Sequence, residues 1–167
     1  MLGHRRIVPS IQQQHCNHHC AVTVESYGNY DYRLIQFIIA LISLIVSNQQ
    51  IEHKHIGYLA IVGLATGLSA GVFIANLYLR QFDLWLLSQL DMHGIPYKLY
   101  KRYIDDICMI IRASDAQRVQ EIANSWHESI RLKLSGLGNE HIPFLDLALS
   151  IVNNRWTYTL YRQPLAI

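Results

Sequence analysis

Charge is scarce in this chain. Only 16% of its 167 residues are charged, and 14 Lys and Arg against 12 Asp and Glu give a formal net charge of +2. About a quarter of the residues are charged in a typical soluble domain. The chain therefore lacks the basic tail or arm that marks many nucleic-acid-binding proteins, so an argument for nucleic acid must come from a site. The hydrophobic fraction of 51% excludes intrinsic disorder for the chain as a whole.

Cysteine is also scarce, with three residues. Three Cys imply no disulfide framework and favour a reducing compartment, so we predict an intracellular protein of the cytoplasm or nucleus. Residues 1–14 lack the apolar core of a secretory signal, and we predict no targeting segment there. The segment His15–Cys20 contains two Cys and three His. No second ligand pair follows it, which favours ordinary polar loop residues over a structural zinc site.

Neither long apolar run is a clear membrane span. Leu34–Val46 has 13 residues interrupted by Gln36 and Ser43, whereas a span needs about 20 apolar residues, so we predict a buried helix. Ile56–Leu79 is longer but contains Asn76 and several Gly. Glycines four residues apart also occur in membrane helix pairs, so a membrane hairpin is an alternative. The charged second half of the chain argues against that alternative.

Local signals predict a mixture of helices and strands. Asn29 or Asp31 can cap a helix, Ser114 with Gln117 forms a capping box, and Asn153-Asn154 is a natural hairpin turn. The expected elements are a strand at Ala21–Val24, a helix to about Ser47, a helix from near Ser69 to Leu90, two strands within Leu99–Arg112, a helix from Ser114 with an apolar stripe reaching Ile130, and strands at Phe144–Val152 and Arg155–Tyr161. This order favours an α+β fold, with an antiparallel sheet backed by helices on one face.

The most informative feature is the pair Asp105-Asp106, which lies between two strongly apolar strands. Adjacent carboxylates repel each other unless a cation neutralises them. Magnesium is a hard ion that binds carboxylate and phosphate oxygens, so paired Asp on a rigid hairpin suits metal-assisted phosphoryl transfer. The alternative is a solvated turn without chemistry.

Segments on both sides of this pair resemble one protein family. Arg102–Ile107 (RYIDDI) resembles the aromatic-x-Asp-Asp catalytic turn of reverse transcriptases. Upstream, Gly63–Gly71 and Ala75–Leu79 are similar to that family's Gly-rich turn and template-side helix. Downstream, Ile142–Leu147 and Thr159–Pro164 resemble segments that follow the palm in Penelope-like and related retroelement enzymes.

The resemblance covers roughly residues 21–164 and implies a palm domain of ferredoxin-like or RRM-like topology, with fingers and thumb largely missing. It divides the chain into an unassigned segment (1–20), the palm (21–135) and a C-terminal hairpin of the palm–thumb junction (136–167). The implied activity is RNA-directed DNA synthesis, in which Mg²⁺ (a two-ion site, or Mn²⁺) assists nucleotidyl transfer to a primer 3′ hydroxyl. The implied partners are an RNA template, a DNA primer, dNTP and the missing polymerase parts, with no membrane.

The resemblance also gives roles to individual residues. Asp105 and Asp106 are the implied catalytic and metal-binding residues. The implied nucleotide or template contacts are Gly63, Gly67, Ser69, Asn76 and Tyr103. The implied primer or backbone contacts are Lys101, Arg102, Tyr161 and Arg162. Gly63 and Gly67 also suit a loop that needs positive φ and close backbone approach.

One departure from the family pattern concerns the metal. A two-ion site normally needs a further carboxylate facing the Asp pair. In the register of Ser26-Tyr27 this position is Thr23, which supplies no charge, and the nearby Glu25 is a candidate substitute. The alternative function is therefore a non-catalytic, degenerate palm that at most binds nucleic acid.

Overall fold

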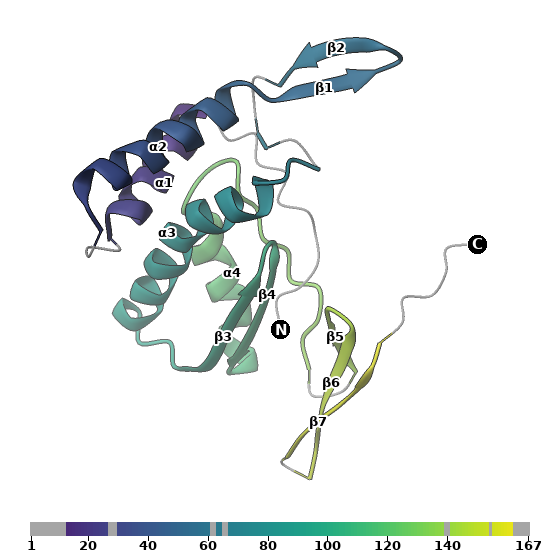
Figure 1. The fold of residues 1–167 in the computed structure, drawn as a ribbon. Coiled ribbons are helices and arrows are strands. Elements are labelled where there is room, and N and C mark those ends of the chain that lie inside the picture. Colours follow the sequence, from purple (N-terminus) through teal and green to yellow (C-terminus); the bar gives the residue numbers. More distant parts are fainter. Residues whose placement is uncertain are drawn as a thin grey trace. The chain divides into compact units, whose positions relative to one another are not determined.

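The computed structural model describes residues 13–26, 30–60, 63–64, 67–138, 141–153 and 155–161. It is a mixed α+β structure, as predicted, and its strands pair antiparallel (Figure 1). The chain divides into two compact units, one of Val8–Leu87 and one containing Ser88–Ile167. In the described ranges the strands form three small sheets, ordered β1-β2, β3-β4 and β5-β6-β7.

The Val8–Leu87 unit contains helices and one hairpin. Its elements are α1 (Gln13–Ser26), α2 (Tyr32–Ser47), β1 (Gln50–His53), β2 (Ile56–Leu59) and most of α3 (Gly71–Met92).

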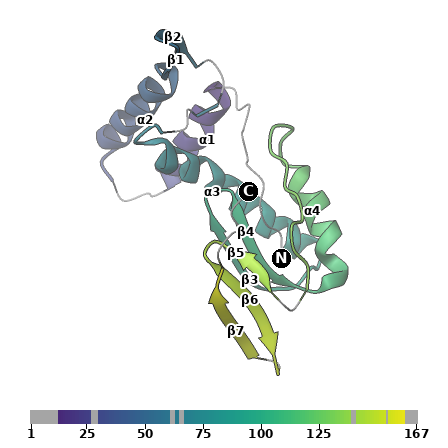
Figure 2. The same ribbon diagram turned by 90° about the vertical axis from the view of Figure 1, so that its right-hand side faces the viewer.

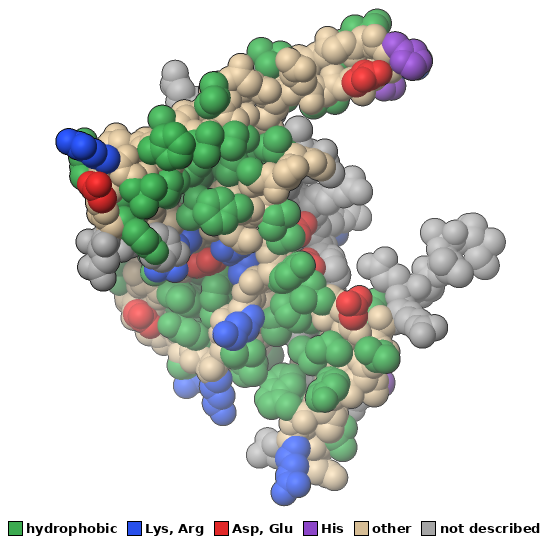
Figure 3. Space-filling view, viewed as in Figure 1, with side chains coloured by type: hydrophobic (Ala, Val, Ile, Leu, Met, Phe, Trp, Pro, Cys, Tyr) green, Lys and Arg blue, Asp and Glu red, His purple; other side chains and the backbone are tan. Residues whose placement is uncertain are grey.

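The helix α2 confirms the predicted capping and length. The Asp31 side chain accepts a hydrogen bond from the Arg33 amide at 3.1 Å, which satisfies an amide of the first turn. One face of α2 buries Ile35, Ile42 and Val46. Its outer face keeps large apolar side chains at the surface (Figure 3).

The strand predicted at Ala21–Val24 is wrong, because these residues belong to α1. Val22, Thr23 and Val24 are β-branched, and such residues favour strands in a local reading. Tertiary contacts override this preference. The Thr23 side chain is fully buried, where its Oγ1 donates to the Leu77 carbonyl at 3.0 Å and accepts from Gln81 Nε2 at 2.9 Å. Thr23 thus joins α1 to α3.

The hairpin β1–β2 was not predicted. It pairs Gln50–His53 with Ile56–Leu59 around Lys54 and His55, which have positive φ of 51° and 62°. All of its strand residues are exposed. None of the helices in the described ranges combines the length and apolarity that a membrane crossing requires.

The Ser88–Ile167 unit carries the acidic pair. Its elements after α3 are β3 (Tyr97–Tyr103), β4 (Asp106–Ile111), the 3₁₀ turn η1 (Ala113–Asp115), α4 (Ala116–Asn124), β5 (Ile142–Phe144), β6 (Leu147–Val152) and β7 (Arg155–Leu160). The helix α4 covers one face of the β3–β4 hairpin, as two perpendicular views show (Figures 1 and 2). It buries Ala116, Val119 and Ala123.

The third predicted helix has different ends in the structure. Its N-cap residue is Asp115 rather than Ser114, and the Gln117 side chain donates to Glu121 at 3.2 Å instead of returning to the helix start. The helix stops at Asn124, and the Asn124 side chain pairs with both backbone groups of Leu132 (Nδ2 to the carbonyl 3.1 Å, amide to Oδ1 2.6 Å). The apolar stripe beyond that point is therefore not helical.

The C-terminal hairpin is confirmed at Asn153, which has a φ of +50° between the paired residues Val152 and Arg155. The strand predicted at Phe144–Val152 is divided into β5 and β6 by a turn at Leu145-Asp146. The two hairpins of this unit share a small core, in which Cys108 and Ile142 are buried and Phe144 and Leu149 pack against them.

Candidate functional site

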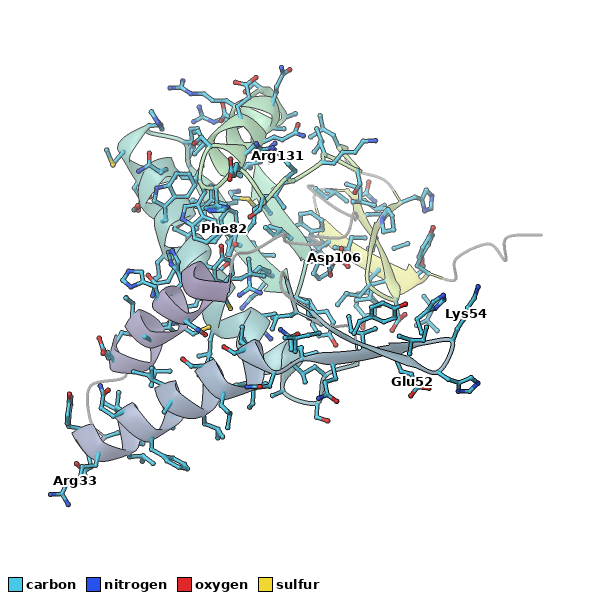
Figure 4. All side chains as sticks on the ribbon, turned by 90° about the horizontal axis from the view of Figure 1, so that it is seen from above. Arg33, Glu52, Lys54, Phe82, Asp106 and Arg131 are labelled. Atoms are coloured by element: carbon cyan, nitrogen blue, oxygen red, sulfur yellow. The ribbon has the colours of Figure 1, made fainter. Side chains whose placement is uncertain are left out.

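The acidic pair lies at a tight strand–strand turn, as predicted. Tyr103 pairs with Asp106 across the β3–β4 hairpin, which leaves Ile104 and Asp105 as the two turn residues. Asp106 is the first residue of β4 (Figure 4). The two carboxylates are therefore attached to a hairpin whose ladder fixes both of their backbone positions.

The turn contains a strained residue. Ile104 has a φ of +53°, which is rare for a β-branched side chain, and left-handed backbone costs such residues about 1–2 kcal/mol. The Arg102 guanidinium stabilises the turn by donating from Nη1 to the Ile104 carbonyl at 3.0 Å. Strained backbone of this kind concentrates at functional sites, where surrounding contacts hold it in place.

The two carboxylates have different surroundings. Asp106 is only 8% exposed and Asp105 is half-buried. After Asp106 the strand continues with Ile107, Cys108 and Met109, which are all buried, so the start of β4 is anchored in the core. Burial also raises the pKa of the Cys108 thiol. A rigid, partly buried acidic pair is a place where a cation would relieve charge repulsion.

Four of the other residues expected at this site, Lys101, Arg102, Tyr103 and Tyr161, lie in the same unit as the acidic pair. Lys101 and Tyr103 are exposed on β3, and Arg102 is half-buried. The Tyr161 amide donates to the Asp146 carbonyl at 2.7 Å, so the two downstream segments of the family resemblance meet in the structure. Arg162 lies outside the described residues.

The carboxylates of the turn decide which metal ion could bind there. Asp105 and Asp106 suit one hard divalent ion, which takes carboxylate oxygens and completes its shell with water or phosphate. A two-ion site would require a third carboxylate. Among the residues that the structure describes, no group of three or more His, Cys, Asp or Glu is arranged to hold a metal. The described residues therefore offer two adjacent carboxylates to one ion, and no third carboxylate is grouped with them in the described ranges.

The positions expected to supply the third ligand lie on α1. Thr23 is fully buried in its contact with α3, and Glu25 is exposed near the end of α1. Both belong to the Val8–Leu87 unit, whereas the acidic pair belongs to the other. The premise of a palm strand ending at Thr23 is wrong for this structure, because the segment is helical.

The Gly-rich turn has the backbone expected of it. Gly63 and Gly67 have φ of 81° and 94°, a region that glycine adopts without strain. Ser69 is exposed in the same segment, and Asn76 is exposed in the second turn of α3. A groove of about 430 Å³ runs beside this turn, lined by Asn48, Gln49, Gln50, Ile51, Glu52, Gly67, Leu68 and Ser69.

Gln49, which was not predicted as a functional residue, holds the Gly-rich turn in place. This side chain is buried, and its Nε2 donates to the carbonyls of Val46 at 2.9 Å and Gly63 at 3.0 Å. Its backbone carbonyl also accepts from the Ala60 amide at 2.8 Å. A polar residue at the end of an apolar helix is the only sequence signal for this role.

The His15–Cys20 segment lies on α1, so its prediction as loop residues is wrong. Cys16 and Cys20 are buried one helical turn apart, with their Sγ atoms 4.0 Å from each other. Their hydrogen bond lowers the pKa of Cys16 and raises that of Cys20. Cys20 Sγ also lies 3.7 Å from the Ile74 carbonyl, which makes the pair part of the α1–α3 core.

Comparison with known proteins does not assign this chain to a family. No protein-family model matches the chain, and no match is found among the curated proteins.

Proposed function

We propose that this chain is the palm of a reverse transcriptase, an RNA-directed DNA polymerase, and that Asp105 and Asp106 bind a divalent metal ion there. The observation that carries the proposal is the acidic pair at the strained two-residue turn of β3–β4. This hairpin has the residue order and the turn of the family's catalytic motif. Its basic neighbours, Lys101 and Arg102, suit a phosphate-bearing substrate.

The proposal gives a role to four residues of the β3–β4 hairpin. When bound, Mg²⁺ or Mn²⁺ would supply charge neutralisation for a triphosphate and an attacking 3′ hydroxyl. Asp105 and Asp106 would hold the ion, and the hairpin would keep both carboxylates in one orientation. The exposed ring of Tyr103 would contact the nucleotide or template, and Lys101 would contact backbone phosphates.

The test is primer extension. Purified chain is given a primed RNA template, dNTPs and Mg²⁺, and extension is followed on a denaturing gel. The double variant Asp105→Asn/Asp106→Asn is expected to lose extension entirely. Asp146→Asn is the matched control, because Asp146 occupies a similar turn one hairpin later and is exposed. Extension that is equal in the double variant and the wild type would overturn the metal-binding role.

The second candidate function is a non-catalytic palm that binds nucleic acid. The observation that favours it is Thr23, to which the family register assigned the third carboxylate and which here packs α1 against α3. This candidate predicts no extension by the wild type, together with retained binding of the primed template in a filter or anisotropy assay. Loss of both extension and binding would contradict both candidates.

A further inference from the structure

The outer face of α2 carries a row of exposed apolar side chains, which we call the outer stripe. Its members and their exposed fractions are Leu34 at 44%, Phe37 at 64%, Leu41 at 44% and Leu44 at 61%. Figure 3 shows hydrophobic side chains gathered over this helix. The four side chains expose on the order of 350–400 Å² of apolar surface. The largest exposed apolar patch of a typical monomer has about this size and is often functional.

We infer that the outer stripe is a self-association surface, against which α2 of a second copy of this chain packs antiparallel. The spacing of the stripe is 3, 4 and 3 residues, which is the pattern of a helix–helix seam. The opposite face of α2 already buries Ile35, Ile42 and Val46. The helix thus has two apolar faces, and only the inner one is covered.

The stripe is complementary to itself under a two-fold axis. In an antiparallel pair centred near residue 39, Leu34 meets Leu44 of the second copy, and Phe37 meets Leu41 of the second copy. Each of these contacts occurs twice, which is the property of an interface between identical patches. All four contacts join large apolar side chains.

The charge on α2 also favours an antiparallel partner. Arg33 is the one charged residue of this helix sequence, and it lies at the N-terminal end, pointing away from the helix (Figure 4). Antiparallel packing separates the two Arg33 by about 18 Å along the axis. It also brings each Arg33 toward the C-terminal end of the other helix, where a cation is favourable. Parallel packing would instead set the two cations side by side.

A membrane surface fits this helix less well. Helices that lie in a lipid interface usually carry several Lys or Arg on their polar face. The α2 sequence has one Arg and no Lys. The observations therefore favour a second copy as the occupant, and the inference does not depend on polymerase activity.

The area buried between the two copies sets the affinity that we expect. Two stripes with their flanking side chains would bury roughly 1,000 Å² in total, at the low end of specific interfaces. We expect reversible association in the micromolar range, since an interface of this size rarely supports tighter binding without strong anchors.

The test is sedimentation equilibrium of the full chain over about 1–200 µM, the range that brackets micromolar association. The wild type is expected to move from the monomer mass of 19.3 kDa toward twice that value. Phe37→Glu is expected to weaken association at least tenfold. Phe73→Glu is the matched control, because Phe73 is 60% exposed on α3 outside the stripe and should leave association unchanged. Circular dichroism checks that each variant is folded.

A mixing experiment tests the direction of packing. Leu34→Lys and Leu44→Glu should each weaken association alone, and mixing the two variants should restore it, because residues 34 and 44 face each other only in the antiparallel pair. A wild type that stays monomeric at the highest concentration would overturn the inference. It would also be overturned by Phe37→Glu associating like the wild type, or by a monomer that floats with anionic vesicles through this stripe. Restored association in Leu34→Lys mixed with Leu34→Glu would overturn the antiparallel arrangement.

Discussion

The turns Ile104-Asp105 and Leu145-Asp146 are built alike, yet only one of them belongs to the candidate site. Each follows an aromatic residue, each has an aliphatic residue at a φ of +53°, and each places an Asp second in the turn. They differ in the next residue, which is Asp106 in the first hairpin and Leu147 in the second. A tight turn with a strained residue and one Asp is therefore not what distinguishes the site.

The difference lies in the second carboxylate and its burial. Asp106 is nearly buried, at a position where the second hairpin uses an apolar side chain. Burying a charged group costs free energy unless it is compensated. Since the Leu145-Asp146 turn forms with Leu147 at this position, folding of such a hairpin does not require a second acid. The second acid is thus a feature of the first hairpin that the turn itself does not explain.

The largest expected effect comes from breaking the core that the two hairpins share. Ile142→Ala removes a buried side chain that packs with Cys108, and such truncations lower the free energy of unfolding by about 2–5 kcal/mol. Urea denaturation measures this loss. Val152→Ala, at an exposed position of β6, is the control and should change stability by less than about 0.5 kcal/mol. A small loss for Ile142→Ala would show that the hairpins are independent.

Magnesium should distinguish the two turns directly. A ligand present at 100 times its dissociation constant stabilises the folded state by about 2.7 kcal/mol. We expect Mg²⁺ to raise the melting temperature of the wild type and of Asp146→Asn, and to have no effect on Asp106→Asn. A thermal melt with and without EDTA measures the shift. An equal rise in melting temperature for Asp106→Asn would show that Mg²⁺ binds somewhere other than the acidic turn.

Giving the second turn an acidic pair should destabilise it. Leu147→Asp sets two carboxylates side by side and removes an apolar contact, and we expect a loss of about 1–3 kcal/mol. Leu147→Asn is the isosteric control, which keeps the polar burial but omits the charge. If the charge matters, the two variants converge near pH 3, where carboxylates are protonated. Equal free energies of unfolding for Leu147→Asp and Leu147→Asn at pH 7 would show that the charge is not what destabilises the turn.

The strain at the two turns predicts a smaller difference. Glycine adopts positive φ freely, so Ile104→Gly should raise the free energy of unfolding by up to about 1 kcal/mol, after the loss of some apolar contact. Leu145→Gly should gain less, because Leu is not β-branched and suffers less in this region. Parallel denaturation curves of the two variants measure the difference, and a greater gain at Leu145 would contradict the ranking.

The smallest expected effect is a pH dependence from Cys108, which lies on the first hairpin where it packs against the second. Burial raises its pKa in the folded state, so the neutral thiol is favoured on folding. Its contribution is complete below the unfolded pKa of about 8.5 and is lost as the pH rises through the folded pKa. Cys108→Ala should therefore flatten the decline in stability above about pH 8.5. If the free energy of unfolding of Cys108→Ala falls with pH as steeply as that of the wild type, other titratable groups cause the decline.

Much of the local structure was predictable because its signals are local. The cap at Asp31, the acidic turn between apolar strands and the Asn153 turn all act within a few residues, and each is found where predicted. The positive φ of Gly63 and Gly67 followed from residue type in the same way. The end of α4 at Asn124 was not predicted; there the Asn124 side chain pairs with the backbone of Leu132, a contact that local patterns do not show.

The sequence by itself determined the α+β class, the helix α2 and the place of Asp105 and Asp106 at a hairpin turn. Only the tertiary structure decided that Ala21–Val24 is helical, since the Thr23 hydroxyl bonds to Leu77 and Gln81 across a helix pair. It also decided that Gln49 supports the Gly-rich turn, and that Asp106 is buried whereas Asp146 is exposed. The physical reason is range: caps and turns are satisfied by neighbouring residues, whereas burial and side-chain partners depend on segments that folding brings together.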